Sequence, residues 1–477
     1  MKPIYIVSWL FALAVSFVSC DDWLDKTPKD RLYPDVYFKT EDELRLFTNQ
    51  FYNNLVPSAV DIYSESSDLI VKSDLMLEMS GQRIIPDEGN GWNFTALRDI
   101  NFYLQYSHNC TEVNARNRYD GVARFFRAYF YFEKVKRYGD IPWYDKALDS
   151  DDPELYKARD SREFVMQKML EDLDFAIANL PKTKNAYVLT RWTALALKSR
   201  VCLFEGTFRK YHGLEDCEKY LNACVSASET FMNESGYTLY KSGSTPYRDL
   251  FASINLQADE VIFGRDYEAS LSVLHNVQNY ENSTTMGRPG MNKKIVNSYL
   301  MADGSRFTDK AGYETMTFDQ ECQNRDPRLA QTIRTPGYTR IGSTKKEAPN
   351  LAYTMTGYHL IKYSMTANYD EYNKSCNDIP LFRTAEVYLN FAEAKAELGT
   401  LKQADINKSI KLLRDRVGMT NLDMELANSK PDPYLMSAAT GYPNVKGANQ
   451  GVILEIRRER TIELAMEGFR YYDIMRW

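Results

Sequence analysis

The sequence contains few residues that could bind a metal or a nucleic acid. Its four histidines are isolated, and none of its seven cysteines forms a CxxC pair, the spacing that many zinc sites use. Lys and Arg number 59 against 65 Asp and Glu, which gives a net charge of −6, whereas nucleic-acid-binding chains carry a basic footprint. We therefore expect no metal, no cofactor and no nucleic-acid partner.

Glycine, proline and long apolar runs are also scarce. The 23 Gly and 17 Pro among 477 residues exclude a collagenous or linker-rich chain. Beyond the N-terminus no segment approaches the length of about 20 apolar residues that a membrane-spanning helix needs. Aromatic residues are abundant, with 34 Tyr, 23 Phe and 6 Trp. Tyrosine suits both protein cores and wet binding surfaces.

Residues 1–19 have the pattern of an export signal. Lys2 is followed by an uncharged run that ends at Cys20. The segment 17–20, FVSC, resembles a bacterial lipoprotein signal, in which the cysteine becomes the acylated N-terminus. The acidic residues that directly follow Cys20 resemble the surface-export tags of Bacteroidetes lipoproteins. We expect a lipid anchor at Cys20 that holds the protein at a membrane without spanning it. The alternative is a short anchor helix with an incidental cysteine.

The six remaining cysteines are predicted to be free thiols. Cys217 and Cys224 lie on one expected helix, where a rise of about 1.5 Å per residue places their Cα atoms about 10 Å apart. A disulfide tolerates a Cα separation of up to about 7 Å, so these two cannot be bridged without breaking the helix.

Apolar stripes with helical spacing predict a mainly α-helical fold. Thr40 and Glu43 form a capping-box pattern, and Gly139 and Gly206 are expected to end helices. The separation of these two glycines, 67 residues, is close to twice the 34-residue period of tetratricopeptide repeats. This spacing favours a tetratricopeptide-like scaffold. The alternative is a generic helical domain. The expected helices are 40–55, 93–106, 121–138, 161–180, 191–205, 214–231, 385–398, 405–416 and 452–469.

The middle of the chain breaks this helical order. Short strand-like pieces are expected at 237–240, 260–263, 351–355 and 358–363, separated by loops. Loops of this length in a compact protein are usually functional. The chain is therefore divided into a signal segment (1–19), an N-terminal helical region (20–236), a loop-rich region (237–379) and a C-terminal helical region (380–477).

A set of glutamates in the C-terminal region could be mistaken for a catalytic centre. Carboxylates held about 5–10 Å apart can hydrolyse glycosidic bonds, which leaves a helical glycoside hydrolase as the alternative function. The many neighbouring arginines favour structural ion pairs instead, with Arg383 pairing to one of the glutamates. We predict no catalytic residue. Segment 325–328, RDPR, is expected to form a turn. The glutamates are Glu386, Glu393, Glu459, Glu463 and Glu467.

Several segments, in order along nearly the whole chain, resemble the SusD/RagB family of Bacteroidetes outer-membrane lipoproteins. The start of the mature chain, 20–25 (CDDWLD), is one of them. The others are RFFRAYFYFEKVKRYGDIP at 124–142, MADG at 301–304, RDPRL at 325–329, IPLFRTAE at 379–386 and the final segment 459–477.

This resemblance implies a SusD-like architecture and a partner. The expected fold is a tetratricopeptide-like helical scaffold with an irregular ligand-binding region. The expected partner is a SusC-like TonB-dependent transporter in the outer membrane, on which the surface-exposed lipoprotein sits as a lid. Members bind oligosaccharides or peptides. Similar proteins usually continue for some tens of residues past the segment that ends here at Trp477, so we expect the C-terminal region to be truncated.

The resemblance also directs attention to aromatic residues outside the helical stripes. A flat aromatic ring can stack on a sugar, and neighbouring amides can bind its hydroxyls. Trp92 with Asn93 follows a glycine-rich segment, and Tyr280 with Asn279 lies in the loop-rich region. These four residues are the candidate ligand contacts. A third class of function, an assembly protein that binds only other proteins, remains open at this point.

Overall fold

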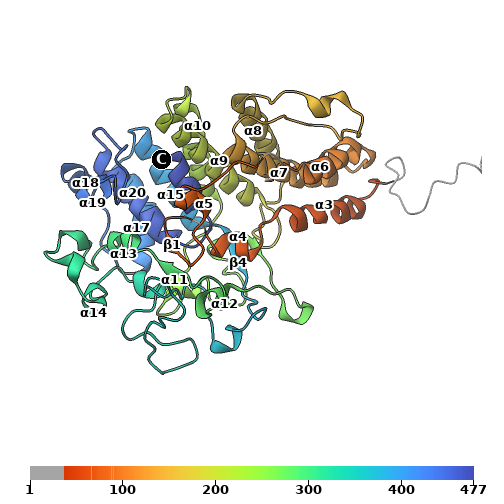
Figure 1. The fold of residues 1–477 in the computed structure, drawn as a ribbon. Coiled ribbons are helices and arrows are strands. Elements are labelled where there is room, and N and C mark those ends of the chain that lie inside the picture. The colour runs from red at the N-terminus through yellow and green to blue at the C-terminus, as the bar shows by residue number, and fades with distance from the viewer. Residues whose placement is uncertain (1–36, 66, 87–88, 90) are drawn as a thin grey trace, which may run out of the picture.

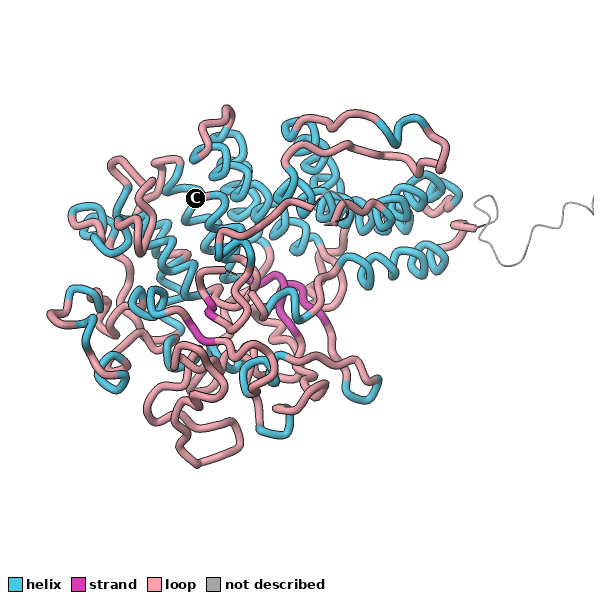
Figure 2. The backbone as a smooth tube through the Cα atoms, in the orientation of Figure 1, coloured by secondary structure: helices cyan, strands magenta, loops and turns pink. Residues whose placement is uncertain are grey.

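The structure is a computed structural model that describes residues 37–65, 67–86, 89 and 91–477. The predicted signal segment and Cys20 lie outside the described residues. The described chain is mainly helical, which confirms the predicted fold class (Figures 1 and 2). Helices occupy the upper part and the left side of the molecule in Figure 2, while loops dominate the lower part and the few strands lie near the centre.

The N-terminal region is built from long helices that pack in neighbouring pairs. Helix α7 packs against α8 and α9 packs against α10, while α3 and α6 lie on the other side of α7 (Figure 1). The helices of this region are α3 (Glu41–Leu55), α4 (Ala59–Tyr63), α5 (Leu77–Ser80), α6 (Thr95–Tyr106), α7 (Val113–Tyr138), α8 (Arg162–Asn179), α9 (Arg191–Tyr211) and α10 (Cys217–Glu234).

Several of these helices begin or end at the predicted signals, but α7 begins eight residues before the predicted position 121, and α4 and α5 were not predicted. The capping box of Thr40 and Glu43 opens α3, and Gly139 follows α7 with a φ of 70°. Gly206, expected to end a helix, instead lies inside α9. A Cβ at Gly206 would lie 2.7 Å from Cγ of Leu221 on α10, so the glycine lets two helices approach closely. The prediction of a helix end there was wrong.

The middle region contains short helices and very little sheet. Strand β1 (Ile70–Val71) pairs antiparallel with β3 (Gly290–Met291), and β2 (Val261–Arg265) pairs antiparallel with β4 (Ile379–Arg383). The short helices that accompany these strands are α11 (Pro246–Asp249), α12 (Val277–Asn282), α13 (Lys293–Ser298) and α14 (Phe318–Glu321).

Of the four strand-like pieces predicted in this region, 260–263 overlaps β2 and the other three do not form strands. Segment 237–240 is irregular. His359 and Leu360 make single bridges, to Gly290 and Ile333, because the surrounding backbone bonds to turns and side chains instead of a continuous ladder. The alternation of residue types alone did not distinguish these segments from strands.

The C-terminal region returns to helices, which gather on the left of Figure 1. Helix α15 packs against α9, α10 and α20 and so joins the two helical regions. The predicted helix 405–416 is divided in two, and the one predicted for 452–469 ends at Glu463. The helices are α15 (Thr384–Glu397), α16 (Gln403–Asn407), α17 (Ile410–Arg416), α18 (Met424–Ser429), α19 (Pro433–Met436), α20 (Gln450–Glu463) and α21 (Arg470–Arg476).

One hydrophobic core extends through all three predicted regions. Phe126 of α7, Phe263 of β2 and Val387 of α15 belong to the same cluster of buried side chains. The described cysteines are all unpaired thiols, which confirms that prediction. None of the helices in the described part of the chain combines the length and the apolar character that crossing a bilayer requires.

The beginning and the end of the described chain are joined by polar contacts. The buried carboxylate of Glu65 accepts hydrogen bonds from the backbone N–H groups of Met466 and Arg470. The guanidinium of Arg470 makes two bonds to Asp68, at 2.7 and 2.9 Å. These contacts fix the segment after α4 against the start of α21.

Candidate functional site

A groove beside Trp92 is the best candidate for a ligand site. It lies between the start of α6 and the loop 139–161, which arches over the helices at the upper right of Figure 1. Its volume is about 600 Å³, within the usual range of about 300–1,000 Å³ for ligand pockets. We call it the Trp92 groove. Its aromatic and apolar walls come from Trp92, Phe94, Leu97, Tyr144, Leu155 and Tyr156.

The loop that forms one wall of the Trp92 groove is held by hydrogen bonds at its base. The hydroxyl of Tyr131 on α7 accepts a bond from the Tyr144 N–H at 2.6 Å, and Asp160 accepts one from the Trp143 N–H at 2.7 Å. Asn101 of α6 donates to the carbonyl oxygen of Tyr144 at 2.8 Å. These bonds tie the start of the loop to α6 and α7 and join its two ends to each other.

Aromatic side chains in this loop divide between the core and the groove. The Trp143 ring stacks on Tyr131 with centroids 4.2 Å apart and is buried. Tyr156, by contrast, is 86% exposed and lines the groove. The sequence analysis did not select Tyr144 or Tyr156. Their position after the end of α7, in a long segment without a helical stripe, is the signal that could have identified them.

The structure places Trp92 in the groove and gives Asn93 a different role. Trp92 is 37% exposed, and its ring makes edge contacts with Phe94 and Tyr138. The Asn93 side-chain oxygen accepts a hydrogen bond from the Thr95 N–H at 2.8 Å, at the start of α6. Asn93 lines a neighbouring shallow pocket and not the Trp92 groove. The two candidates therefore do not share one site.

The second predicted pair, Asn279 and Tyr280, is buried and does not offer a binding surface. Both residues lie in α12, where the sequence analysis expected a loop. Tyr280 is 2% exposed, and its ring packs against Tyr63 with centroids 5.1 Å apart. The Asn279 amide donates to the carbonyl oxygen of Asp370 at 2.8 Å. A ring enclosed in this way cannot stack on a ligand, so the expectation for this pair was wrong.

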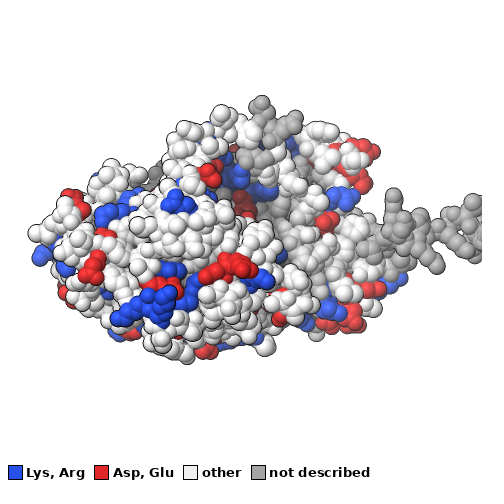
Figure 3. Space-filling view, turned by 60° about the horizontal axis from the view of Figure 1, so that its bottom comes forward, with Lys and Arg blue, Asp and Glu red and all other residues white. Residues whose placement is uncertain are grey.

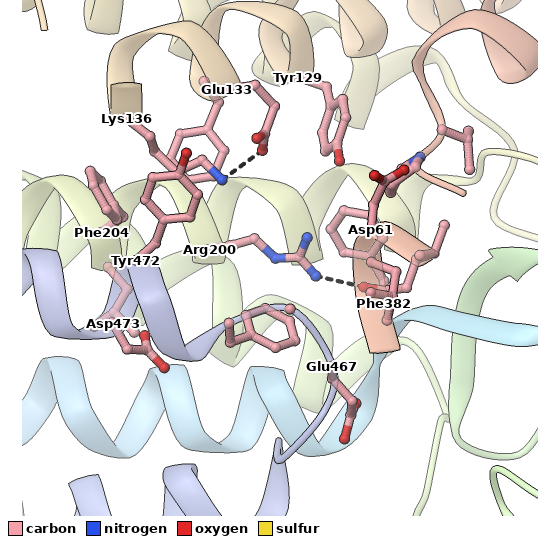
Figure 4. Close-up of a pocket in the computed structure, with 18 of the residues that line it drawn as sticks. Asp61, Tyr129, Glu133, Lys136, Arg200, Phe204, Phe382, Glu467, Tyr472 and Asp473 are labelled. Atoms are coloured by element: carbon pink, nitrogen blue, oxygen red, sulfur yellow. Dashed lines mark hydrogen bonds and ion pairs between the residues drawn. The ribbon is translucent and has the colours of Figure 1, made fainter. Parts of the chain in front are cut away.

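A second cavity lies deeper, between α7, α9, β4 and α21, and is shown in Figure 4. Its volume is about 210 Å³, below the usual range for ligand pockets. Lys136 pairs with Glu133 at 2.7 Å, as Figure 4 shows. Arg200 pairs with Glu386 at 2.7 Å. These two cations at the cavity are therefore already neutralised by carboxylates.

The glutamates considered as catalytic candidates are buried and paired with arginine. Arg383 lies at the centre, with ion pairs to Glu463 (2.8 Å), Glu467 (2.6 Å) and Glu260 (2.9 Å). Two other glutamates pair with arginines that the sequence analysis did not associate with them. Glu386 binds Arg200, and Glu393 binds Arg476.

The RDPR turn extends this ion-pair network. Arg328 is fully buried and pairs with Asp326 at 2.7 Å, Glu459 at 2.5 Å and Glu463 at 3.1 Å. Asp326 also accepts a hydrogen bond from the Arg328 N–H at 2.9 Å, which closes the turn. Arg328 therefore joins the middle region to α20 and has no surface for a ligand.

The lowered pKa values of two of these glutamates do not suit general acid catalysis. Burial raises the pKa of Glu393, but the Arg476 guanidinium outweighs it and brings the pKa to about 2. Burial also raises the pKa of Glu463, but the guanidinium groups of Arg416 and Arg383 outweigh burial. The pKa of Glu463 therefore lies below its ordinary value. A glycosidase acid must carry a proton near neutral pH, and these groups do not.

Two carboxylates with raised pKa values lie away from the Trp92 groove. Burial raises the pKa of Glu65 to about 8 and that of Glu281 to about 7. Glu65 is bonded to the backbone near α21, and Glu281 accepts bonds from Ser364 and from the Tyr363 N–H. Neither lines the groove. Within the described residues, no cluster of three or more His, Cys, Asp or Glu could hold a metal ion.

Comparison with known proteins identifies the family. The SusD family model matches residues 250–477, and a model described as "Starch-binding associating with outer membrane" matches residues 82–191. The chain belongs to the SusD/RagB family. Two curated relatives from Formosa agariphila span the whole fold. SusD-like protein P2 is 25% identical over 97% of this chain and 89% of its own length. SusD-like protein P38 is 23% identical over 100% of this chain and 92% of its own length.

Solved structures show the same fold. A SusD-like protein from Bacteroides fragilis superposes with a TM-score of 0.72 at 23% identity, over 95% of this chain and 89% of that one. A SusD-like carbohydrate-binding protein from the same species superposes with a TM-score of 0.67 at 19% identity, over 92% of this chain and 86% of that one. At these identities the likeness establishes a SusD-like fold.

Proposed function

We propose that this protein is a surface-exposed lipoprotein of the outer membrane that binds glycans and delivers them to a SusC-like TonB-dependent transporter. The observation that carries the proposal is the Trp92 groove, because an exposed tryptophan stands in a cavity of about 600 Å³ on a SusD-like scaffold. A glycan is favoured over a peptide by the starch-binding description of the matching family model.

Replacing Trp92 by alanine is expected to weaken glycan binding by about tenfold to a hundredfold, since aromatic stacking on a flat ring contributes about 1–3 kcal/mol. Thermal stability should change little, because the Trp92 side chain is partly exposed. Isothermal titration calorimetry with an oligosaccharide that the wild-type protein binds measures the loss.

Phe164→Ala is the matched control for this variant. Phe164 is 41% exposed on α8 and does not line the Trp92 groove. Its loss should leave the affinity unchanged. Equal affinities of the Trp92→Ala and wild-type proteins would remove the groove from the binding site. A large fall in melting temperature would show that Trp92 belongs to the core.

The lipid anchor is proposed at Cys20, which lies outside the described residues. The support is the uncharged run of residues 3–19 before it and the resemblance of FVSC to a lipoprotein signal. We expect Cys20→Ser to abolish membrane attachment and to leave the folded domain intact. Cell fractionation with immunoblotting measures this. The variant should move from the membrane pellet to the soluble fraction, and its retention in the pellet would contradict a lipid anchor.

The alternative function, a helical glycoside hydrolase, has little support. All five glutamates considered for it are buried, and each has an arginine partner. No enzymatic activity is proposed. Incubation with the bound oligosaccharide should produce no new reducing ends, and their appearance would favour the hydrolase.

A further inference from the structure

The lining of the Trp92 groove carries charge of one sign. Its charged residues are all cationic, and no Asp or Glu occurs among the described residues that line it. The chain as a whole has a net charge of −6, and on the face shown in Figure 3 basic and acidic side chains lie side by side. The charge of the groove lining therefore differs from that of the face shown in Figure 3. The cationic residues are Arg98, Lys146, Lys157 and Arg159.

Two of these cations are already neutralised by neighbouring carboxylates. Lys146 pairs with Glu154 at 3.0 Å, and Lys157 pairs with Asp160 at 2.9 Å. Lys157 also donates to the carbonyl oxygen of Trp143 at 2.6 Å. These lysines fix the loop 139–161 to itself, and they leave little positive charge for a ligand.

The two arginines remain available to a ligand. The Arg98 guanidinium reaches its only described carboxylate partner, Asp149, at 3.9 Å, and both side chains are largely exposed. Arg159 has no carboxylate within ion-pair distance among the described residues. Asp87 and Glu88, which precede Trp92 in the sequence, lie outside that part of the chain. Two guanidinium groups with free donors thus face one aromatic groove.

Arg159 is placed where a stacked sugar would meet it. Its guanidinium carbon lies 4.9 Å from the centroid of the Trp92 ring. A sugar that stacks on this face of the Trp92 ring therefore contacts or displaces the guanidinium. A carboxylate or a sulfate ester on the sugar can accept two parallel N–H bonds from arginine and neutralise its charge. A neutral hydroxyl leaves the charge of the guanidinium that it covers uncompensated.

We propose that the Trp92 groove selects acidic glycans, with Arg159 and Arg98 binding a carboxylate or sulfate group while Trp92 and Tyr156 contact the sugar ring. This inference rests on the proposed glycan-binding function and specifies the chemical class of its ligand. The carboxylate of a uronic acid and a sulfate ester share the chemistry that an arginine pair recognises.

The test uses the full chain, purified in detergent, and two matched ligand pairs. One pair is an oligogalacturonate and its methyl ester, and the other is a sulfated galactan oligosaccharide and its desulfated form. By calorimetry we expect at least one acidic member to bind about tenfold or more tightly than its neutral counterpart. The pair that shows the difference identifies whether carboxylate or sulfate is recognised. Raising the salt from about 0.05 M to about 0.5 M should reduce this preference, because exposed charges are screened.

Variants locate the preference in the groove. Arg159→Gln should weaken binding of the acidic ligand about fivefold, and the double variant with Arg98→Gln should remove most of the preference, while binding of the neutral ligand stays unchanged. Lys411→Gln, a change of an exposed cation on α17, is the control and should have no effect. If the arginine variants bind the acidic ligand as the wild type does, the inference is overturned.

The outcome also separates this inference from the proposed function. If the wild-type protein binds acidic and neutral ligands equally and the Trp92→Ala variant loses binding of both, the selectivity is overturned and glycan binding stays in place. Binding of the acidic ligand that Trp92→Ala does not weaken would exclude the groove and overturn both proposals. The absence of binding by either pair would overturn the acidic selectivity.

Discussion

Replacing Arg383 by methionine is expected to lower the free energy of unfolding by about 3–5 kcal/mol, the usual result of removing one partner from a buried ion pair. Arg383 is fully buried, and its guanidinium serves Glu260, Glu463 and Glu467 at 2.6–2.9 Å. Glu463 would keep Arg328 and Arg416, but among the described residues Glu467 would keep only Lys362 as a cationic partner. Urea unfolding measures the change as a lower midpoint.

Arg45→Met provides the matched control for this prediction. Arg45 is an exposed residue of α3 that pairs with Asp42 at 3.2 Å, and exposed pairs contribute about 0–1 kcal/mol. The urea midpoint of Arg383→Lys should lie between those of Arg383→Met and the wild type, because an ammonium group keeps the charge but not the planar geometry of the guanidinium. Equal midpoints for Arg383→Met and the wild type would show that the network contributes little to stability.

Replacing Phe126 by alanine is expected to destabilise the fold by about 3–5 kcal/mol, the usual result of emptying a buried aromatic site. Phe126 is buried on α7, and its ring contacts Tyr52 of α3 at 5.0 Å and Phe51 at 6.2 Å between centroids. It also lies on the wall of the cavity in Figure 4, so the substitution would enlarge an existing gap.

Phe164→Ala is the comparison here too, because it removes the same side chain from an exposed position on α8. Its melting temperature should stay close to that of the wild type. Differential scanning calorimetry of the two variants compares them directly. Equal melting temperatures for both variants would mean that the contact between α3 and α7 does not stabilise the protein.

Local signals in the sequence were sufficient for most of the long helices, whereas most of the short ones were not predicted. Capping residues and apolar stripes act over a few residues, so Thr40 with Glu43 and Gly139 marked helix boundaries correctly. Gly206 shows where local reasoning failed, because a glycine that ends a helix and a glycine that admits a neighbouring helix look alike in sequence. Only the contact with Leu221 distinguishes the two.

The candidate site was only partly predictable for a related reason. Trp92 could be selected because it follows glycines and belongs to no helical stripe. Tyr280 was selected because it lies in the loop-rich region, but it is buried by Tyr63, more than 200 residues away in the sequence. Glu386 likewise finds Arg200 at a separation of 186 residues. Partners so distant are determined by the tertiary fold and leave no local pattern.

The contacts of Glu65 and Asp68 with Arg470 have a consequence for how the chain reaches its native state. They join residues separated by 401–405 positions, so almost the entire polypeptide forms one closed loop. The entropy of closing that loop must be overcome before these contacts contribute, which slows folding. Until Met466 and Arg470 have been synthesised, the Glu65 carboxylate lacks these two donors. The segment after α4 therefore becomes native only after Arg470, the first residue of α21, has been made.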